Sequence, residues 1–307
     1  MQKKQLCIAM GLTTLGVLAT LSQALAVDPP TAGSVLESVK EAPPAPKPAD
    51  QILDKPAEPV KAAAPMAAGA TVKVAGFRFK GNTVYSEAQL QALLAEYQGK
   101  EQTLDGLNEA AEVIKSHYRQ HEYFLAQAIL PPQEIKDGMV EIQIVEGSIG
   151  KTNIKMADNA RLKESVARKY MDAMLPSGTL ITETGIEKPL LLLNDLPGVT
   201  IRSTIKPGAE TGQADMDVQV GDEGKRFAGD VQLDNWGNRN TGRLRLTGTA
   251  EARNLTGYGD LLSIRGLYGE DKGTTLGRLS YSLPVGSLGT KVTASYSDLT
   301  YELGGAF

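Results

Sequence analysis

The chain has 307 residues, with 32 Lys and Arg against 36 Asp and Glu, and a formal net charge of −4 at pH 7. This acidic balance lacks the cationic footprint that phosphate binding requires, so we expect no nucleic-acid partner. The single cysteine is Cys7, so the chain can form neither an internal disulfide nor a site with several cysteine ligands.

The N-terminus is typical of an exported protein. Lys3 and Lys4 precede an apolar run over about residues 6–21, and Ala24-Leu25-Ala26 gives the small-x-small pattern that signal peptidase cleaves. We predict a secretory signal over residues 1–26; a membrane anchor is the less favoured alternative, because polar residues interrupt the run. Cleavage would leave 30 basic and 36 acidic side chains and no thiol, which fits a bacterial envelope protein.

Residues 27–70 differ sharply in composition from the rest. They hold nine of the 16 prolines and no aromatic residue, so they bury too little apolar area to offset the ordering of the backbone. We predict a linker, partly of polyproline II character. Residues 34–40 could form two turns of helix, although disorder throughout fits the composition equally well.

Two small α+β units follow. The first has a strand over 72–79 with a bulge at Gly76, a helix that begins with a Ser86/Gln89 capping box, a second helix, and strands over 124–130 and 139–145. The same β-α-α-β-β order repeats with a strand over 151–156, helices capped by Asn159 and Thr182, and strands over 199–205 and 216–220.

Beyond residue 226 no helical stripe remains. Five alternating runs, at roughly 227–233, 242–254, 260–268, 276–283 and 291–301, have the ~10-residue length of strands that cross an outer membrane. A soluble sandwich is the alternative. The apolar faces carry Gly, Ala and Leu in place of bulky core residues, which favours a barrel with a wet interior. The polar faces, which we predict to face the pore, carry Arg243, Arg245, Glu251, Arg253, Arg265 and Arg278.

Several motifs resemble one family. The run Phe77-x-Phe79-x-Gly81-Asn82-Thr83 resembles the opening of a POTRA domain, the periplasmic polypeptide-transport-associated module. Leu191–Gly198 resembles the second such module of the haemolysin secretion/activation proteins, the outer-membrane transporters of two-partner secretion. Asp234–Gly237 and Tyr281–Gly286 resemble the start of their barrel. The match covers residues 71–307.

The resemblance implies POTRA domains over 71–147 and 148–225 and the first part of an antiparallel transmembrane β-barrel over 226–307. It also implies a monomeric, cofactor-free, non-enzymatic transporter of the outer membrane, with its POTRA domains in the periplasm. This transporter would export an unfolded secreted partner, a large β-helical exoprotein of haemolysin or adhesin type, without ATP. Residues 34–40 would be the counterpart of the family's plug helix. Five strands cannot close a barrel, so we expect this sequence to be an incomplete version of its gene product.

A POTRA sheet whose last strand is central leaves its second strand at an edge, where an unfolded chain can add by β-augmentation. The predicted contacts are Leu125, Gln127 and Ile129 in the first module and Thr200, Arg202 and Thr204 in the second. The alternative is that these are ordinary edge positions.

Catalytic and metal sites are not predicted. His117 and His121 have the spacing of a zinc pair, but Tyr118 stands where a zinc peptidase needs Glu, and the chain has no third histidine. Two other functions stay open: an assembly factor that inserts other barrels, and a secreted β-rich adhesin without a channel.

Overall fold

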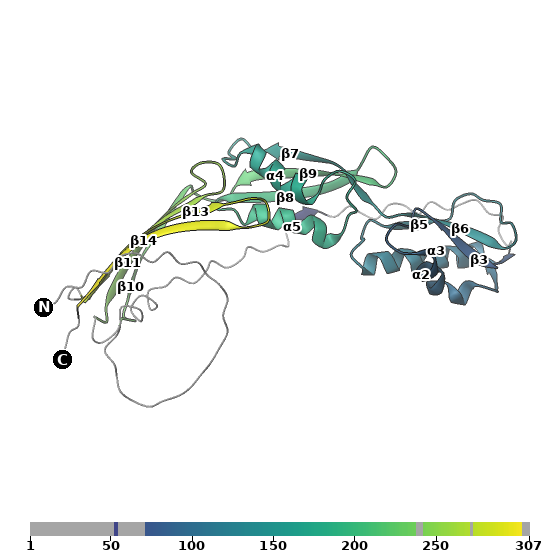
Figure 1. The fold of residues 1–307 in the computed structure, drawn as a ribbon, viewed down its shortest axis with the longest axis horizontal. Coiled ribbons are helices and arrows are strands. Elements are labelled where there is room, and N and C mark those ends of the chain that lie inside the picture. The colour runs from purple at the N-terminus through teal and green to yellow at the C-terminus, as the bar shows by residue number, and fades with distance from the viewer. Residues whose placement is uncertain (1–51, 55–70, 238–241, 271–272, 303–307) are drawn as a thin grey trace, which may run out of the picture.

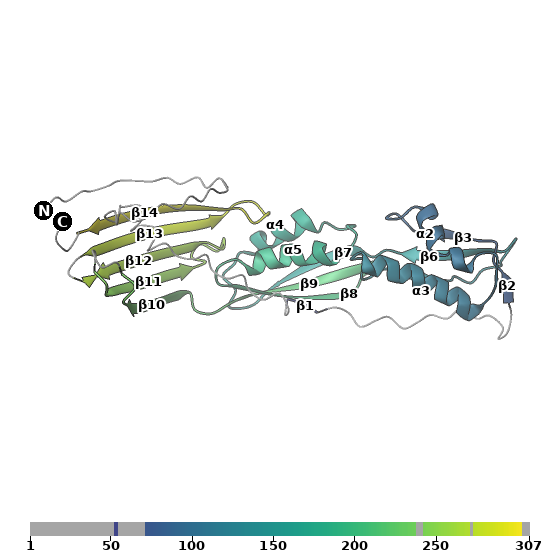
Figure 2. The same ribbon diagram turned by 90° about the horizontal axis from the view of Figure 1, so that it is seen from below.

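The computed structural model describes residues 52–54, 71–237, 242–270 and 273–302. The predicted signal over 1–26 and the short helix over 34–40 lie outside these ranges. Two α/β modules and a five-stranded sheet follow one another along the long axis of the molecule (Figures 1 and 2). None of the described helices is long and apolar enough to cross a membrane.

The first module is a three-stranded sheet covered by two helices. Its elements are β2 (Thr71–Lys73), β3 (Gly76–Lys80), α2 (Glu87–Leu93), η1 (Ala95–Tyr97), β4 (Glu101–Thr103), α3 (Leu104–Gln120), β5 (Gln127–Ile129) and β6 (Met139–Val145). The sheet order is β3-β6-β5, and β2 pairs separately with β4. The expected capping box at Ser86 and Gln89 is present. The predicted bulge at Gly76 is instead a break between β2 and β3.

The second module repeats the order β-α-α-β-β. It contains β7 (Ser148–Met156), α4 (Glu164–Met174), α5 (Glu183–Asn194), β8 (Val199–Pro207) and β9 (Gln213–Asp222). Thr182 caps α5 as expected, accepting from the Gly185 N–H at 3.1 Å. Asn159 does not cap α4, because that helix begins only after Lys163.

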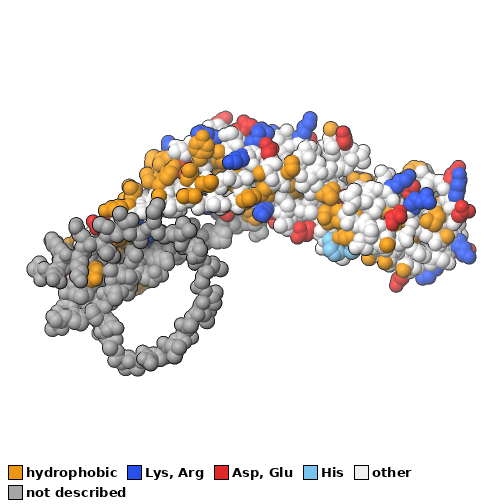
Figure 3. All heavy atoms as spheres, in the orientation of Figure 1, with side chains coloured by type: hydrophobic (Ala, Val, Ile, Leu, Met, Phe, Trp, Pro, Cys, Tyr) orange, Lys and Arg blue, Asp and Glu red, His pale blue; other side chains and the backbone are white. Residues whose placement is uncertain are grey.

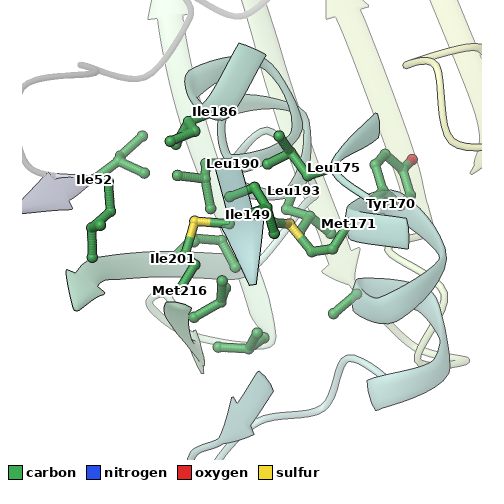
Figure 4. Close-up of a cluster of buried hydrophobic side chains, with 14 of the residues drawn as sticks. Ile52, Ile149, Tyr170, Met171, Leu175, Ile186, Leu190, Leu193, Ile201 and Met216 are labelled. Atoms are coloured by element: carbon green, nitrogen blue, oxygen red, sulfur yellow. The ribbon is translucent and has the colours of Figure 1, made fainter. Parts of the chain in front are cut away.

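A fourth strand, β1 (Leu53–Asp54), joins the second module from the proline-rich segment, giving the sheet order β1-β8-β9-β7. Ile52, directly before it, is only 6% exposed and belongs to the core cluster of the module (Figure 4). The linker expected over 27–70 is therefore interrupted by a structured piece. Ile52-Leu53 is an aliphatic pair in a proline-free stretch between Pro48 and Pro56, so the chain can extend there and bury a side chain.

The last part is an antiparallel meander of strands in sequential order. It comprises β10 (Phe227–Asp234), β11 (Arg245–Arg253), β12 (Leu261–Gly269), β13 (Thr274–Pro284) and β14 (Lys291–Tyr301). The second strand begins three residues later than predicted, so Arg243 lies before β11 and not on it.

Candidate functional sites: two sheet edges and a two-faced sheet

The register of β10–β14 separates apolar from charged side chains. Gly229, Ala250, Ile264, Leu279 and Tyr296 are consecutive cross-strand partners and form one row. The large apolar side chains on the face of this row are exposed, and Figure 3 shows hydrophobic atoms gathered over this part of the molecule. They are Phe227, Val231, Leu233, Leu246, Ile264, Tyr268, Leu279, Val292 and Tyr296.

The opposite face carries the charged residues predicted for the pore. Arg265 and Arg278 are cross-strand partners on it. Arg245 forms an ion pair with Asp234 at 2.8 Å, and Arg253 forms one with Glu251 at 2.9 Å. Arg243 is excluded from this set, because it lies outside the strand.

An apolar patch interrupts the charged face. Leu267, Leu276 and Leu299 are cross-strand partners that pack together, and the first two are only 3% exposed. The strand alternation places these leucines on the same side of the sheet as Arg265 and Arg278. The sequence prediction of one apolar face and one charged face did not include them. This face is therefore polar with one leucine row across it.

The turn between β11 and β12 fixes the sheet to the second module. The Lys163 N–H donates to the Gly257 carbonyl at 2.9 Å, and the Lys163 ammonium lies 3.8 Å from the ring centroid of Tyr258. A Cβ atom added at Gly259 would lie 3.0 Å from the Leu196 side chain. The backbone of the turn is therefore in close contact with that side chain. The end of the meander that holds this turn therefore faces the modules.

The first module exposes one sheet edge at β5. The other edge, β3, is covered by α2, since the Gln91 side chain donates to the Phe77 carbonyl at 3.2 Å. On β5, Gln127 is half-buried and Ile129 is 38% exposed. Leu125 was expected on this edge, but the strand spans only 127–129 and Leu125 packs against the core of the second module. Its predicted place on the edge strand is therefore wrong, and its role as a client contact stays a prediction.

Gln133 hydrogen-bonds to the part of β6 with which β5 does not pair. Beyond the end of β5, its side-chain amide donates to the Glu141 carbonyl and accepts from the Glu141 N–H, both at 2.7 Å. The amide thus replaces a strand at this point of β6. Only the short stretch from Gln127 to Ile129 presents an edge.

The edge of β8 is occupied, which the sequence did not indicate. The Ile201 N–H donates to the Asn194 side-chain oxygen at 3.1 Å, and the Ser203 N–H donates to the Ile52 carbonyl at 2.7 Å. β1 runs parallel to β8 with Leu53 opposite Ser203. The expectation of a free edge is therefore wrong for this structure.

The three predicted residues of β8 lie on the face away from the helices. Thr200 and Thr204 are half-buried and Arg202 is exposed, while the alternate residues of the strand are buried. Beside them, Asp217 accepts from Lys206 at 2.7 Å and from Lys155 at 2.9 Å. These bonds hold the pKa of the Asp217 carboxyl well below its usual range. This face of the sheet thus carries charged side chains.

The Gly81-Asn82-Thr83 motif is anchored by a buried carboxylate. Glu146, 6% exposed, accepts from the Thr83 hydroxyl, from the Thr83 and Val84 N–H groups at 2.6 and 2.9 Å, and from the Tyr118 hydroxyl at 2.8 Å. Burial raises the pKa of Glu146, but the hydrogen bonds outweigh it and the net pKa is lowered. The motif therefore has a structural role, which is to attach this turn to the end of β6.

The two histidines form a ring cluster. The rings of His117 and His121 lie 4.4 Å apart, and His117 lies 4.7 Å from the ring of Tyr85. Within the described residues, no three His, Cys, Asp or Glu side chains gather as metal ligands would.

Two modules of POTRA-like order, followed by a membrane-type meander with one apolar face, define the class of outer-membrane barrel proteins with periplasmic POTRA domains. Two family models match the chain: a ShlB-type POTRA domain over residues 72–147, and the haemolysin secretion/activation protein ShlB/FhaC/HecB over residues 212–307.

Relatives support the same assignment. The heme/hemopexin transporter protein HuxB of Haemophilus influenzae strain 86-028NP is 35% identical over 71% of this chain and 38% of its own length. The outer membrane transporter CdiB of Dickeya dadantii is 26% identical over 60% of this chain and 31% of its own. The chain therefore spans well under half the length of these curated relatives.

The fold agrees with a solved structure. CdiB from Escherichia coli superposes with a TM-score of 0.61 at 22% identity, covering 77% of this chain and 44% of that one. The chain belongs to the haemolysin secretion/activation protein family, which is a family of transporters. The β10–β14 meander accordingly belongs to the outer membrane, and the modules lie in the periplasm.

Proposed function

We propose that this protein exports an unfolded secreted polypeptide across the outer membrane as the transporter of a two-partner secretion pair. The observation that carries the proposal is the two-faced β10–β14 sheet, which the turn at Gly257 joins directly to the second module. A client segment bound to that module would therefore already lie next to the membrane part of the protein. In the proposed division, the modules span 71–147 and 148–225, and the membrane part begins at 226.

The modules bind the client as an added strand. Main-chain hydrogen bonds at a sheet edge give affinity for any extended segment, and neighbouring side chains select among sequences. The exposed stretch of β5, with Gln127 and Ile129, is one such edge. On the second module the proposed contacts are Thr200, Arg202 and Thr204, on the face of β8 away from the helices, where β1 already pairs with the edge of the strand.

The charged face of the meander lines the passage. Arg245, Glu251, Arg253, Arg265 and Arg278 keep it hydrated, which an extended polar backbone in transit requires. The leucine row at Leu267 would offer the client apolar contact at one position along the pore. No chemical step on the client is part of the proposal.

The client is a large secreted protein. HuxB is named as a heme/hemopexin transporter. CdiB is named as an outer membrane transporter, with no substrate in its name. For this chain we propose the coarser class, a large β-helical exoprotein of haemolysin or adhesin type, exported by a monomer.

A secretion assay tests the proposal. In a host that expresses the full-length gene with the large exoprotein encoded beside it, we expect the exoprotein in the medium. Without the transporter gene we expect it to remain in the periplasm. Equal secretion with and without the gene would refute the transport function.

A photo-cross-linking amino acid tests the edges in the same host. Placed at Ile129 it should cross-link to the exoprotein, whereas placed at the exposed Glu109 of α3, on the helical side, it should not. Cross-linking that is equal at both positions would count against strand addition at β5.

A further inference from the structure

The end of the β10–β14 meander that faces the modules lies at the periplasmic boundary of the membrane. There the Gly257 carbonyl accepts from the Lys163 N–H at 2.9 Å. In the turn between β13 and β14, a Cβ atom added at Gly289 would lie 2.7 Å from the Leu192 side chain. Figures 1 and 2 show α4 and α5 at the end of the second module that adjoins the meander. Both turns therefore lie at the level of the phospholipid headgroups in the inner leaflet of the outer membrane.

Large apolar side chains stay exposed at this end of the sheet. Phe227, the first residue of β10, is 64% exposed, and Tyr258, in the turn between β11 and β12, is 47% exposed. Val285 and Leu288, in the turn between β13 and β14, are exposed as well. Aromatic side chains at the margin of an apolar band are typical of a membrane interface. The lipid-facing surface therefore extends to the turns beside the second module.

A cation lies over each of the two exposed aromatic rings. The Lys163 ammonium is 3.8 Å from the ring centroid of Tyr258, and the Arg226 guanidinium is 5.7 Å from that of Phe227. Both basic side chains are exposed. A long basic side chain at a membrane interface rests its stem on apolar surface and places its charge among the headgroups. Of these two cations, Lys163 belongs to the second module and not to the sheet.

The acids near Lys163 are bound to other groups. Glu164 follows it directly and forms an ion pair with Arg168 at 2.6 Å. Asp222 forms an ion pair with Arg161 at 2.6 Å. Among the residues that the structure describes, no acid forms an ion pair with Lys163. Its charge is therefore open to an anion from outside the chain.

Lys163 also occupies a position that does not favour lysine. It is the N-cap of α4 (Glu164–Met174) and makes no side-chain capping bond. Ser, Thr, Asp or Asn would supply that bond, and the positive end of the helix dipole disfavours a cation at this place. The local structure of α4 thus gives no reason for a lysine, whereas contact with an external anion gives one.

We propose that Lys163 on Tyr258, together with Arg226 on Phe227, binds the headgroup phosphates of anionic phospholipids, of the phosphatidylglycerol class, in the inner leaflet of the outer membrane. A zwitterionic headgroup offers the same phosphate with a cation beside it, so the anionic lipid is attracted more strongly. The second module is then in contact with the membrane as well as with the sheet. The proposal rests on the place of the meander in the membrane and not on the export of a client.

Fluorescence quenching by lipids measures this preference. We use the full-length protein in phosphatidylcholine nanodiscs, with a fluorescent non-canonical amino acid at position 258. An equal small fraction of the lipid is either phosphatidylglycerol or phosphatidylcholine that carries a nitroxide near the headgroup end of one acyl chain. The labelled phosphatidylglycerol should quench at least about threefold more strongly, because the cation concentrates anionic lipid beside the reporter.

Two comparisons assign the preference to Lys163. In Lys163→Gln the two labelled lipids should quench the reporter at 258 equally; the main-chain bond to Gly257 does not depend on the substituted side chain. The same reporter at Tyr296, in the apolar row of β14, should show no preference in either protein. Equal quenching by both lipids at 258 in the unchanged protein, or a preference that survives Lys163→Gln, would overturn the proposal.

A salt titration tests the same contact without any change at Lys163. Between about 0.1 M and about 1 M salt, screening should bring the preference for phosphatidylglycerol at position 258 close to one. A preference that is constant over this range would contradict a charge-based contact. Absence of quenching by either lipid at 258 would show that this turn does not reach the membrane, and would overturn the proposal as well.

Discussion

Glu146 anchors the Gly81–Val84 turn of the first module from the far end of β6. It accepts four hydrogen bonds, from Thr83, Val84 and Tyr118. Replacing it with Gln leaves an amide group facing donors, so we expect Glu146→Gln to lower the free energy of unfolding by about 2–3 kcal/mol. Urea denaturation of the full-length protein measures this. Tyr118→Phe removes one of the four bonds and should cost about 1 kcal/mol; an equal loss in both variants would contradict the network.

The same carboxylate predicts a pH dependence. Its pKa in the folded protein lies below the ordinary value of 4.5, so its stabilisation is complete above about pH 4.5 and is lost as the pH falls through the lower, folded-state pKa. Thermal unfolding between pH 3 and pH 7 should show this loss in the parent protein. In Glu146→Gln the acid-dependent part should be smaller, and an unchanged pH profile would count against the assignment.

At the scale of elements, Leu125 joins the two modules. It packs against the core of the second module although it belongs to the chain of the first, and nearby the Glu122 carbonyl accepts from the Glu183 N–H at 3.0 Å. Leu125→Asp should therefore destabilise the protein by about 2–4 kcal/mol. Gln127→Asp, two residues on and half-buried, should change stability by less than about 1 kcal/mol. Differential scanning calorimetry compares them, and similar losses would contradict the packing.

The turn between β11 and β12 makes the second contact of this kind, between the five-stranded sheet and the second module. Gly259 has φ +77° and no room for a Cβ, because Leu196 would lie at 3.0 Å. We expect Gly259→Val to cost about 2–4 kcal/mol through strain and displacement of the turn. Gly286 also has a positive φ but open space around it, so Gly286→Ala should cost only about 1–2 kcal/mol. Limited proteolysis of the second module in membranes should show faster cleavage in the first variant only.

Local patterns predicted most elements and missed the long-range contacts. The alternation after residue 226 predicted the meander because cross-strand partners share a face, and Thr182 was found because a cap is set by its own neighbours. β1 could not be foreseen from composition, since its burial depends on a pocket formed by residues more than a hundred positions away. Leu125 failed for the same reason, because its partner is another module.

For the whole molecule, the proposed export function depends on which solvent meets each face of β10–β14. Two neighbouring cross-strand rows offer a matched comparison: Ile264, Leu279 and Tyr296 on one face, and Ser263, Ser280 and Ser295 on the other. Single cysteines can be placed at each, because Cys7, in the predicted signal, is the one cysteine of these 307 residues.

Labelling of these six variants in outer membranes with a membrane-impermeant maleimide is the most direct measurement. We predict rapid labelling at the three serine positions, which face water, and protection at 264, 279 and 296, which face lipid. Rapid labelling at 264, 279 and 296, or protection of all six in a protein that stays soluble without detergent, would contradict the membrane assignment and the export function built on it.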